Sequence, residues 1–196
     1  DDGFIADYSA VGPPPDFRRK PDICAPGSVL TAAQDKKGNE YAYGDGTSFS
    51  APLATGFAAC LMQLFPEITA MGTIDSIRRC AHLYPYYDYA HGYGVPQAGY
   101  FFRTNPSGLE ATFSFVRVDT GTKIEVAPSA DSLSGKIQER LLFWNLTDSA
   151  GRIIQYNVIE VTTPDPVLVE FDLVAGERRG YKICVWYRGY YAETDF

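Results

Sequence analysis

The stretch YGDGTSFSAP, residues 43–52, lies directly before LATGFAACLMQLF, an apolar run that reads as a helix. The pattern predicts a turn of small residues that leads into a helix from about Ser48 to Leu64, ended by Pro66. Pro52 fits the first turn of such a helix, where its missing N–H removes no helical hydrogen bond. We therefore expect the Ser48 hydroxyl at a helix N-terminus, among residues too small to block access.

A serine in this position has either a structural or a chemical role. As an N-cap it would simply begin the helix, which is common. As a nucleophile it would profit from its own backbone N–H and from the positive end of the helix dipole, because both favour the oxyanion of acyl transfer. Gly46 would let a substrate backbone approach closely. Local chemistry leaves both roles open.

Bulk composition excludes several classes of partner. The chain has 196 residues and a net charge of −7 without a charged block, which argues against nucleic acid and anionic membranes. No apolar run approaches the roughly 20 residues that span a bilayer. The N-terminus resembles neither a signal peptide nor a natural start, so we expect a mature or cut form.

The cysteines point to no metal or redox motif. Cys24, Cys60, Cys80 and Cys184 show no C-x-x-C spacing. Cys60 and Cys80 sit among apolar residues in helical patterns, so we expect small buried thiols, with a disulfide between them as the alternative. No carboxylate cluster has convincing calcium spacing, and we expect no cofactor and no metal.

Composition changes near residue 105. Before it, a second helix is predicted from about Thr69 to His82, and a hairpin between Ser28 and Asp45 around the turn KKGN. After it, six short strands are predicted, which is typical of an antiparallel β-sandwich. The strands are ATFSFVRV, KIEVA, RLLFWNL, RIIQYNVIEV, VLVEFDLV and GYKICVWYR. We predict two domains, 1–104 and 105–196, with the boundary at Asn105 to Gly108.

Five segments in the first domain carry a family resemblance. GTSFSAP resembles the nucleophile motif of the subtilisin-like serine proteases, in which G-T-S precedes two residues, a small one and Pro. YSAVGP, KPDICAPG, IRRCAH and HGYGVPQAGYFF resemble further segments of that family, with Gln97 in place of its usual Asn or Asp. The match runs over about residues 3–102. It implies the C-terminal portion of a subtilisin-like α/β fold, with a β domain appended.

The resemblance implies that Ser48 is the nucleophile of peptide-bond hydrolysis. Gly46, Thr47 and Phe49 are then expected at the substrate, with Phe49 near the leaving-group side of the cleft. Asp22 and Pro26 match family positions that are structural, so we interpret them as scaffold. The resemblance also implies a protein or peptide substrate and a secreted or cell-surface protein.

The sequence departs from the family pattern in the catalytic triad. The family order is aspartate, histidine, serine, and both partners belong to segments upstream of the nucleophile. His82 and His91 follow Ser48, so we expect packing or capping of His82 and a turn at His91. Asp7, Asp16 and Asp45 are likewise read as turn residues. We therefore expect activation by a missing N-terminal part of the catalytic domain, with self-association as the alternative partner.

Two functions stay open at this point. One is a subtilisin-like endopeptidase of which this chain is the nucleophile-bearing part. The other is an inactive protease remnant that binds, inhibits or supports through its β domain. In that domain, alternation puts Ile183, Val185 and Tyr187 on one face and Cys184, Trp186 and Arg188 on the other, either as core or as an exposed aromatic platform. The sequon NLT at 145–147 falls at a strand end.

Overall fold

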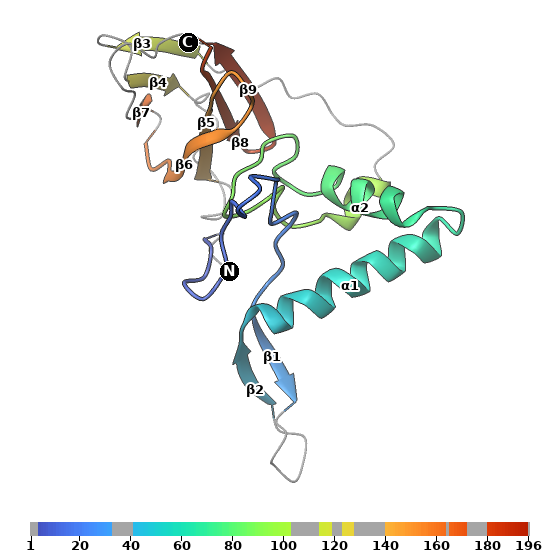
Figure 1. The fold of residues 1–196 in the computed structure, drawn as a ribbon. Coiled ribbons are helices and arrows are strands. Elements are labelled where there is room, and N and C mark those ends of the chain that lie inside the picture. Colours follow the sequence, from blue (N-terminus) through green and yellow to red (C-terminus); the bar gives the residue numbers. More distant parts are fainter. Residues whose placement is uncertain are drawn as a thin grey trace. The chain divides into compact units, whose positions relative to one another are not determined.

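The computed structural model describes residues 4–32, 41–102, 114–118, 123–127, 140–163, 165–171 and 180–195. The chain divides into two compact units, one that extends to Phe102 and one that begins at Arg103. The first unit contains helices and an antiparallel hairpin, and the described part of the second contains only sheets (Figure 1). The predicted boundary at 105–108 lies outside the described residues, so the domains 1–104 and 105–196 stay a prediction.

The first unit is built around a hairpin and two helices. Strands β1 (Ser28–Ala32) and β2 (Tyr41–Asp45) pair antiparallel, which confirms the predicted hairpin, while its turn lies outside the described residues. Helix α1 spans Thr47–Leu64 and helix α2 spans Ala70–Arg79, both close to their predicted bounds. A short 3₁₀ helix, Ala98–Phe102, ends the unit.

Local signals mark both ends of α2 and the end of α1. The Thr69 side chain accepts a hydrogen bond from the Gly72 N–H at the start of α2, and Arg78 and Arg79 occupy its last turn. Pro66 follows the end of α1 after one residue, as predicted. Among the described residues no strands pair in parallel. The first unit therefore mixes helices with an antiparallel hairpin and does not itself display the parallel sheet of an α/β fold.

The second unit holds two antiparallel sheets. One has the order β3 (Ser114–Val118), β4 (Lys123–Ala127) and β7 (Val167–Glu170). The other has the order β6 (Ile153–Glu160), β5 (Leu141–Thr147), β8 (Lys182–Tyr187) and β9 (Tyr190–Asp195). The six predicted strands are present within their described parts. Strand β9 was missed, because the sequence YYAETD ends in polar residues that favour no strand.

One cluster of buried residues joins the two sheets. Its members come from β4 and β7 on one side and from β5 and β8 on the other, together with residues just beyond the strands. They are Val126, Leu142, Trp144, Leu146, Val161, Val169, Phe171, Ile183, Val185 and Tyr187. This confirms the core face predicted for β8. On the other face, Cys184 and Trp186 are also buried, which excludes an exposed aromatic platform there, and Arg188 lies beyond the strand.

The structure corrects the prediction for Cys60 and places the sequon. Cys60 is exposed on α1, whereas Cys80 is buried as predicted, and no disulfide joins them. Asn145 of the sequon is only 4% exposed within β5, so the folded chain hides this amide from glycosylation. In the described part of the chain, no helix is long and apolar enough to span a bilayer.

The packing of the second unit leads to a stability prediction. Leu142 is fully buried in the cluster, while Leu168 on β7 is 43% exposed. We expect Leu142→Ala to lower the free energy of unfolding by about 2–5 kcal/mol, because it removes contacts and leaves a cavity. Leu168→Ala is the matched control and should cost less than about 1 kcal/mol. Guanidinium unfolding followed by the fluorescence of Trp144 and Trp186 reports on this unit, and equal effects of the two variants would contradict the assigned core.

Candidate active site

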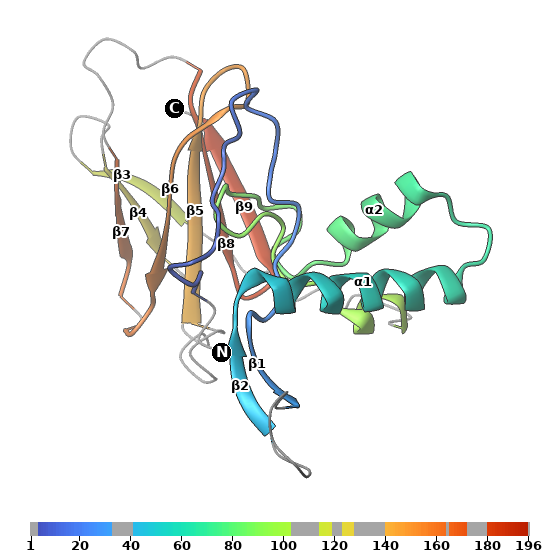
Figure 2. The same ribbon diagram turned by 60° about the horizontal axis from the view of Figure 1, so that its bottom comes forward.

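The chain turns from β2 into α1 at Gly46 (Figure 2). Gly46 has φ 144° and ψ 153°, a backbone conformation that is open to glycine and costly for other residues. Its N–H donates to the carbonyl of Gly27 at 2.9 Å, and its carbonyl accepts the N–H of Phe49 at 3.0 Å. The first residues of the helix are thereby held against the end of the hairpin.

Ser48 is the second residue of helix α1, and its side chain is exposed. The residue that caps the helix is Gly46, and no side chain makes a capping hydrogen bond, so the N-cap role considered for Ser48 is wrong. Its N–H belongs to the first turn, before the regular i to i−4 hydrogen bonds of the helix begin, and this turn carries the positive end of the dipole. Within the described chain, the Ser48 hydroxyl makes no hydrogen bond and stays open to solvent.

The proline of the motif lies deeper in the helix than predicted. Because α1 begins at Thr47, Pro52 is its sixth residue and is not in the first turn. The missing Pro52 N–H is therefore the one that would have bonded to the carbonyl of Ser48. The prediction of a cost-free proline is wrong, and the carbonyl of Ser48 loses its helical partner.

The other predicted site residues flank Ser48 unequally. Thr47 is exposed, as Ser48 is. Phe49 instead packs back onto the hairpin, because a Cβ atom at Gly44 would lie 2.5 Å from the Phe49 Cζ. The next serine is tied down as well, since the Ser50 Oγ donates to the Pro26 carbonyl at 3.2 Å. This turn therefore exposes the side chains of Thr47 and Ser48. The Phe49 ring instead packs on Gly44 and so fastens the turn to the hairpin.

Asp45 is the last residue of strand β2, so the prediction that it lies in a turn is wrong. Its Oδ1 accepts a hydrogen bond from the Ser28 Oγ at 2.5 Å across the hairpin, and Asp45 and Ser28 are partners in the register. Both residues are exposed. Ser28 was not singled out from the sequence, and only the pairing register could have identified it.

Asp22 joins the first segment of the unit to helix α2. Its carboxylate accepts from the Arg78 Nε at 2.8 Å and from Nη2 at 2.5 Å, and it also pairs with Lys20. Burial alone would raise the pKa of Asp22, but the hydrogen bonds from Lys20 and Arg78 outweigh it and lower that pKa. The scaffold role predicted for Asp22 agrees with these contacts.

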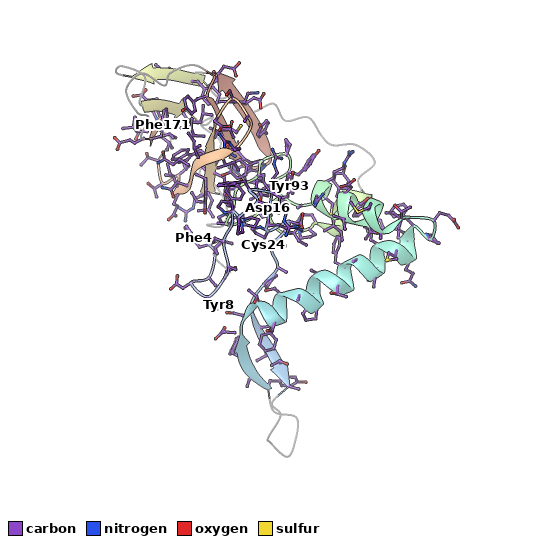
Figure 3. The ribbon with its side chains drawn as sticks, in the orientation of Figure 1. Phe4, Tyr8, Asp16, Cys24, Tyr93 and Phe171 are labelled. Atoms are coloured by element: carbon purple, nitrogen blue, oxygen red, sulfur yellow. The ribbon has the colours of Figure 1, made fainter. Side chains whose placement is uncertain are left out.

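The segment around Cys24 packs along the loop that follows α2. The Cys24 N–H donates to the Gly94 carbonyl at 3.0 Å, and the Tyr93 N–H donates to the Asp22 carbonyl at 2.9 Å. Figure 3 labels Cys24 and Tyr93 on these two segments. Burial, together with the charge of Asp88, raises the pKa of the Cys24 thiol to about 12, so this thiol is no nucleophile at neutral pH.

The two histidines are built into the same loop. His91 Nδ1 lies 3.0 Å from Asp88 Oδ2, and the fully buried Asp88 also accepts the N–H groups of Ala90 and His91. The His82 Nδ1 accepts the N–H of Val95 at 2.9 Å, and partial desolvation lowers the pKa of His82. No hydrogen bond joins either imidazole to Ser48 in the described part of the chain. His91 lies in a turn, as predicted, whereas His82 is exposed and its ring bonds to the backbone of Val95.

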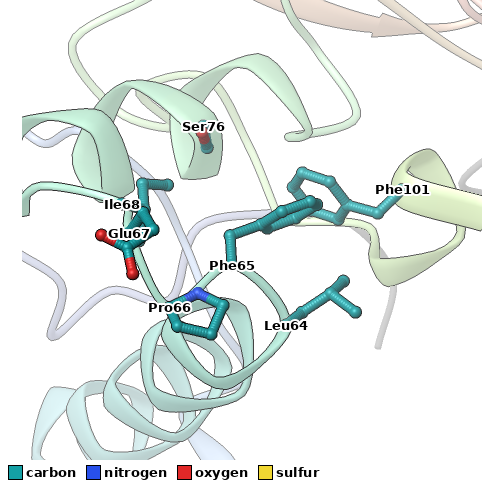
Figure 4. A pocket seen from close by; sticks show the side chains of 7 residues that line it. All are labelled: Leu64, Phe65, Pro66, Glu67, Ile68, Ser76 and Phe101. Carbon is teal, nitrogen blue, oxygen red and sulfur yellow. The ribbon is translucent and has the colours of Figure 1, made fainter.

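An apolar pocket of about 500 Å³ lies at the far end of helix α1 (Figure 4). It is lined by Leu64, Phe65, Pro66, Glu67, Ile68, Ser76 and Phe101. At about 1.5 Å of rise per residue, Leu64 is about 24 Å from Ser48 along the helix, so this pocket is not the site of Ser48 chemistry. The described residues contain no group of His, Cys, Asp and Glu side chains arranged to hold a metal ion.

The first unit is similar in sequence to known serine proteases. Residues 1–94 match the model of the subtilase family. The chain is 33% identical over 91 residues to the Subtilisin-like protease SBT2.1 of Arabidopsis thaliana, which covers 39% of this chain and 11% of that protein. It is 31% identical over 81 residues to the Serine protease AprX of Bacillus subtilis (strain 168), which covers 35% of this chain and 18% of that protein. The matches therefore span less than a fifth of these relatives.

The backbone conformation of Gly46 leads to a prediction with an internal control. Gly46→Ala should lower the free energy of unfolding by about 1–3 kcal/mol, because alanine is strained at φ 144°. Gly56→Ala, in the interior of α1 where a Cβ meets nothing within 4 Å, should instead stabilise by about 0.5–1 kcal/mol. Circular dichroism at 222 nm, which follows the helices of this unit, measures both, and a neutral Gly46→Ala would overturn the assigned turn.

Asp22 leads to a prediction about acid stability. Its folded-state pKa is lowered, so the unfolded chain binds a proton more readily and the stabilisation is present above the unfolded value near 3.8. That stability should be lost as pH falls below about 4 and through the lower folded pKa. Urea unfolding at pH 3 to 7 should show a shallower acid decline in Asp22→Asn than in the wild type. Parallel declines would show that the carboxylate is not held by Arg78.

Proposed function

Residues 1–94 of this chain belong to the subtilase family, and we propose that they are the nucleophile-bearing part of a serine endopeptidase. The observation that carries this proposal is the exposed hydroxyl of Ser48 in the first turn of a helix that no side chain caps. The aligned relatives are a subtilisin-like protease and a serine protease by name, which supports the same reaction class.

In the proposed reaction the Ser48 Oγ bonds to the carbonyl carbon of the scissile peptide and gives its proton to a base. The carbonyl oxygen becomes an oxyanion, which the first-turn N–H of Ser48 and the helix dipole stabilise. The oxyanion collapses, the C–N bond breaks, and the leaving amine takes the proton from the base. Water then adds to the acyl-enzyme, and the acid product leaves as the Ser48 hydroxyl is restored.

The exposed apolar surface of helix α1 is evidence that another protein segment packs on this unit. None of its 18 residues is charged, and Leu61 is the one that is buried. Leu53, Met62 and Leu64 are each close to half exposed. A helix without charged residues that exposes large apolar side chains is normally covered by a partner, because leaving them in water forfeits about 25 cal/mol per Å² of apolar surface.

We infer that the rest of a catalytic domain covers this helix and supplies the aspartate, the histidine and a second oxyanion donor. Self-association through α1 is the competing partner. The substrate in this account is a protein or peptide, and the protein acts outside the cell or at its surface, as the family resemblance implies.

The second unit is proposed to fold as a β-sandwich. The cluster that contains side chains of both sheets supports this, because facing sheets bury their inward residues together. The proposal assigns it no part in the chemistry.

Labelling with a fluorophosphonate tests the proposed nucleophile in the longest protein that the gene encodes. The probe should label Ser48, with the site read by peptide mass spectrometry. Ser48→Ala should abolish labelling, while Ser50→Ala, which changes a serine bonded to Pro26, should retain it. Labelling that survives in Ser48→Ala would refute the assignment.

The 196-residue chain by itself is the second arm of this experiment. Without a base, the hydroxyl should react slower by a factor of about 10³ or more. Equal rates in the two proteins would contradict the inference that a further segment activates Ser48.

A further inference from the structure

Asp45 is the one charged residue in β1, β2 and α1, the three elements that surround Ser48. In the sequence, no Lys, Arg or His occurs between Lys37 and Arg78. The nearest basic residues in the chain therefore lie outside the hairpin strands and the helix. Because Asp45 is exposed and bonded to the neutral Ser28 hydroxyl, its negative charge is not compensated within these elements.

This charge lies close to the proposed point of attack. Two residues separate Asp45 from Ser48, so their Cα atoms are at most about 11 Å apart. That distance is comparable with the Debye length of about 8 Å at physiological salt, so a charged group of a substrate held at Ser48 feels Asp45 at low salt. The first turn of α1 holds no acid that would add to the charge, nor a base that would cancel it.

We propose that Asp45 is a specificity-determining residue, which makes the site favour a basic side chain close to the scissile bond, on the side of the hairpin. This inference rests on the proposed function of Ser48 and adds to it a class of substrate. A lysine or arginine there would replace the missing counter-charge of Asp45, whereas a glutamate would be repelled.

The outer face of the hairpin extends this surface away from Ser48. In the register, Ser28 pairs with Asp45, Leu30 with Tyr43, and Ala32 with Tyr41, so these residues share one face. Leu30 is 60% exposed, Tyr41 67% and Tyr43 80%. On this face, the pair that contains Asp45 is followed by two apolar pairs, Leu30 with Tyr43 and Ala32 with Tyr41, at intervals of two residues.

An extended substrate segment matches this spacing, because its side chains also repeat every two residues on one face. The occupant we assign to the face is therefore a substrate strand with a basic residue next to the bond and an apolar residue two positions farther away. Continuity with Ser48 and the charge of Asp45 favour this occupant over a second copy of the chain, whose hairpin would bring a like charge.

The test uses the longest protein that the gene encodes and internally quenched peptides. Lys or Glu is placed at each position from three before to three after the scissile bond, with kcat/KM measured at 50 mM salt. At one position on one side of the bond, Lys should exceed Glu by about tenfold. Asp45→Asn should reduce that ratio below threefold, and 1 M salt should do the same in the wild type.

Asp75→Asn is the matched control, since it removes the same charge from helix α2, where Asp75 is exposed in an ion pair with Arg78. It should keep the tenfold ratio.

Fluorophosphonate labelling of Asp45→Asn shows that the variant is folded, and the salt series in the wild type tests the charge independently. A Lys to Glu ratio that neither Asp45→Asn nor salt changes would overturn this inference while leaving the nucleophile intact. Absence of both cleavage and labelling in the wild type would overturn the proposed function and this inference together.

Discussion

The hydrogen bond from the Gly46 N–H to the Gly27 carbonyl is the contact on which the geometry of the first unit depends. It fixes the point at which the chain leaves a strand and enters a helix, in a conformation that only glycine adopts readily. Phe49 packs on Gly44 and Ser50 binds Pro26, so the residues behind Ser48 are held by the hairpin and the preceding loop. The Ser48 hydroxyl is exposed as a consequence, because Phe49 and Ser50 both make contacts behind it.

The same unit contains regular elements that bury few of their apolar side chains. Helix α1 has no charged residue and yet buries little, and the hairpin presents Leu30 and Tyr43 to solvent. Two-stranded hairpins are at best marginally stable in water by themselves. The loop from Cys80 to His91, in contrast, is well buried and rich in internal hydrogen bonds to Asp88. The unit therefore combines a consolidated loop region with a helix and hairpin that call for further contacts.

The second unit shows the opposite balance. Strands β5 and β8 bury residues on both faces, including Phe143 and Trp186, which stack edge to face at 5.6 Å. Along its edge, Lys182, Glu193 and Tyr191 form a chain of polar contacts on neighbouring strands. The side chains that this unit buries among themselves form one cluster with members from both sheets.

The sequence by itself determined the helix that begins within GTSFSAP, the second helix, the hairpin and six of the strands, because periodicity, prolines and caps are local signals. Five of its segments also resemble subtilase motifs, and residues 1–94 match the model of that family. Only the tertiary structure decided that Gly46 is the cap, that Pro52 lies in the second turn, that Cys60 is exposed and that Asn145 is hidden. These outcomes depend on where the helix begins and on which faces other segments cover. The pairing of Ser28 with Asp45 is likewise set by register, a relation between distant residues that no local pattern records.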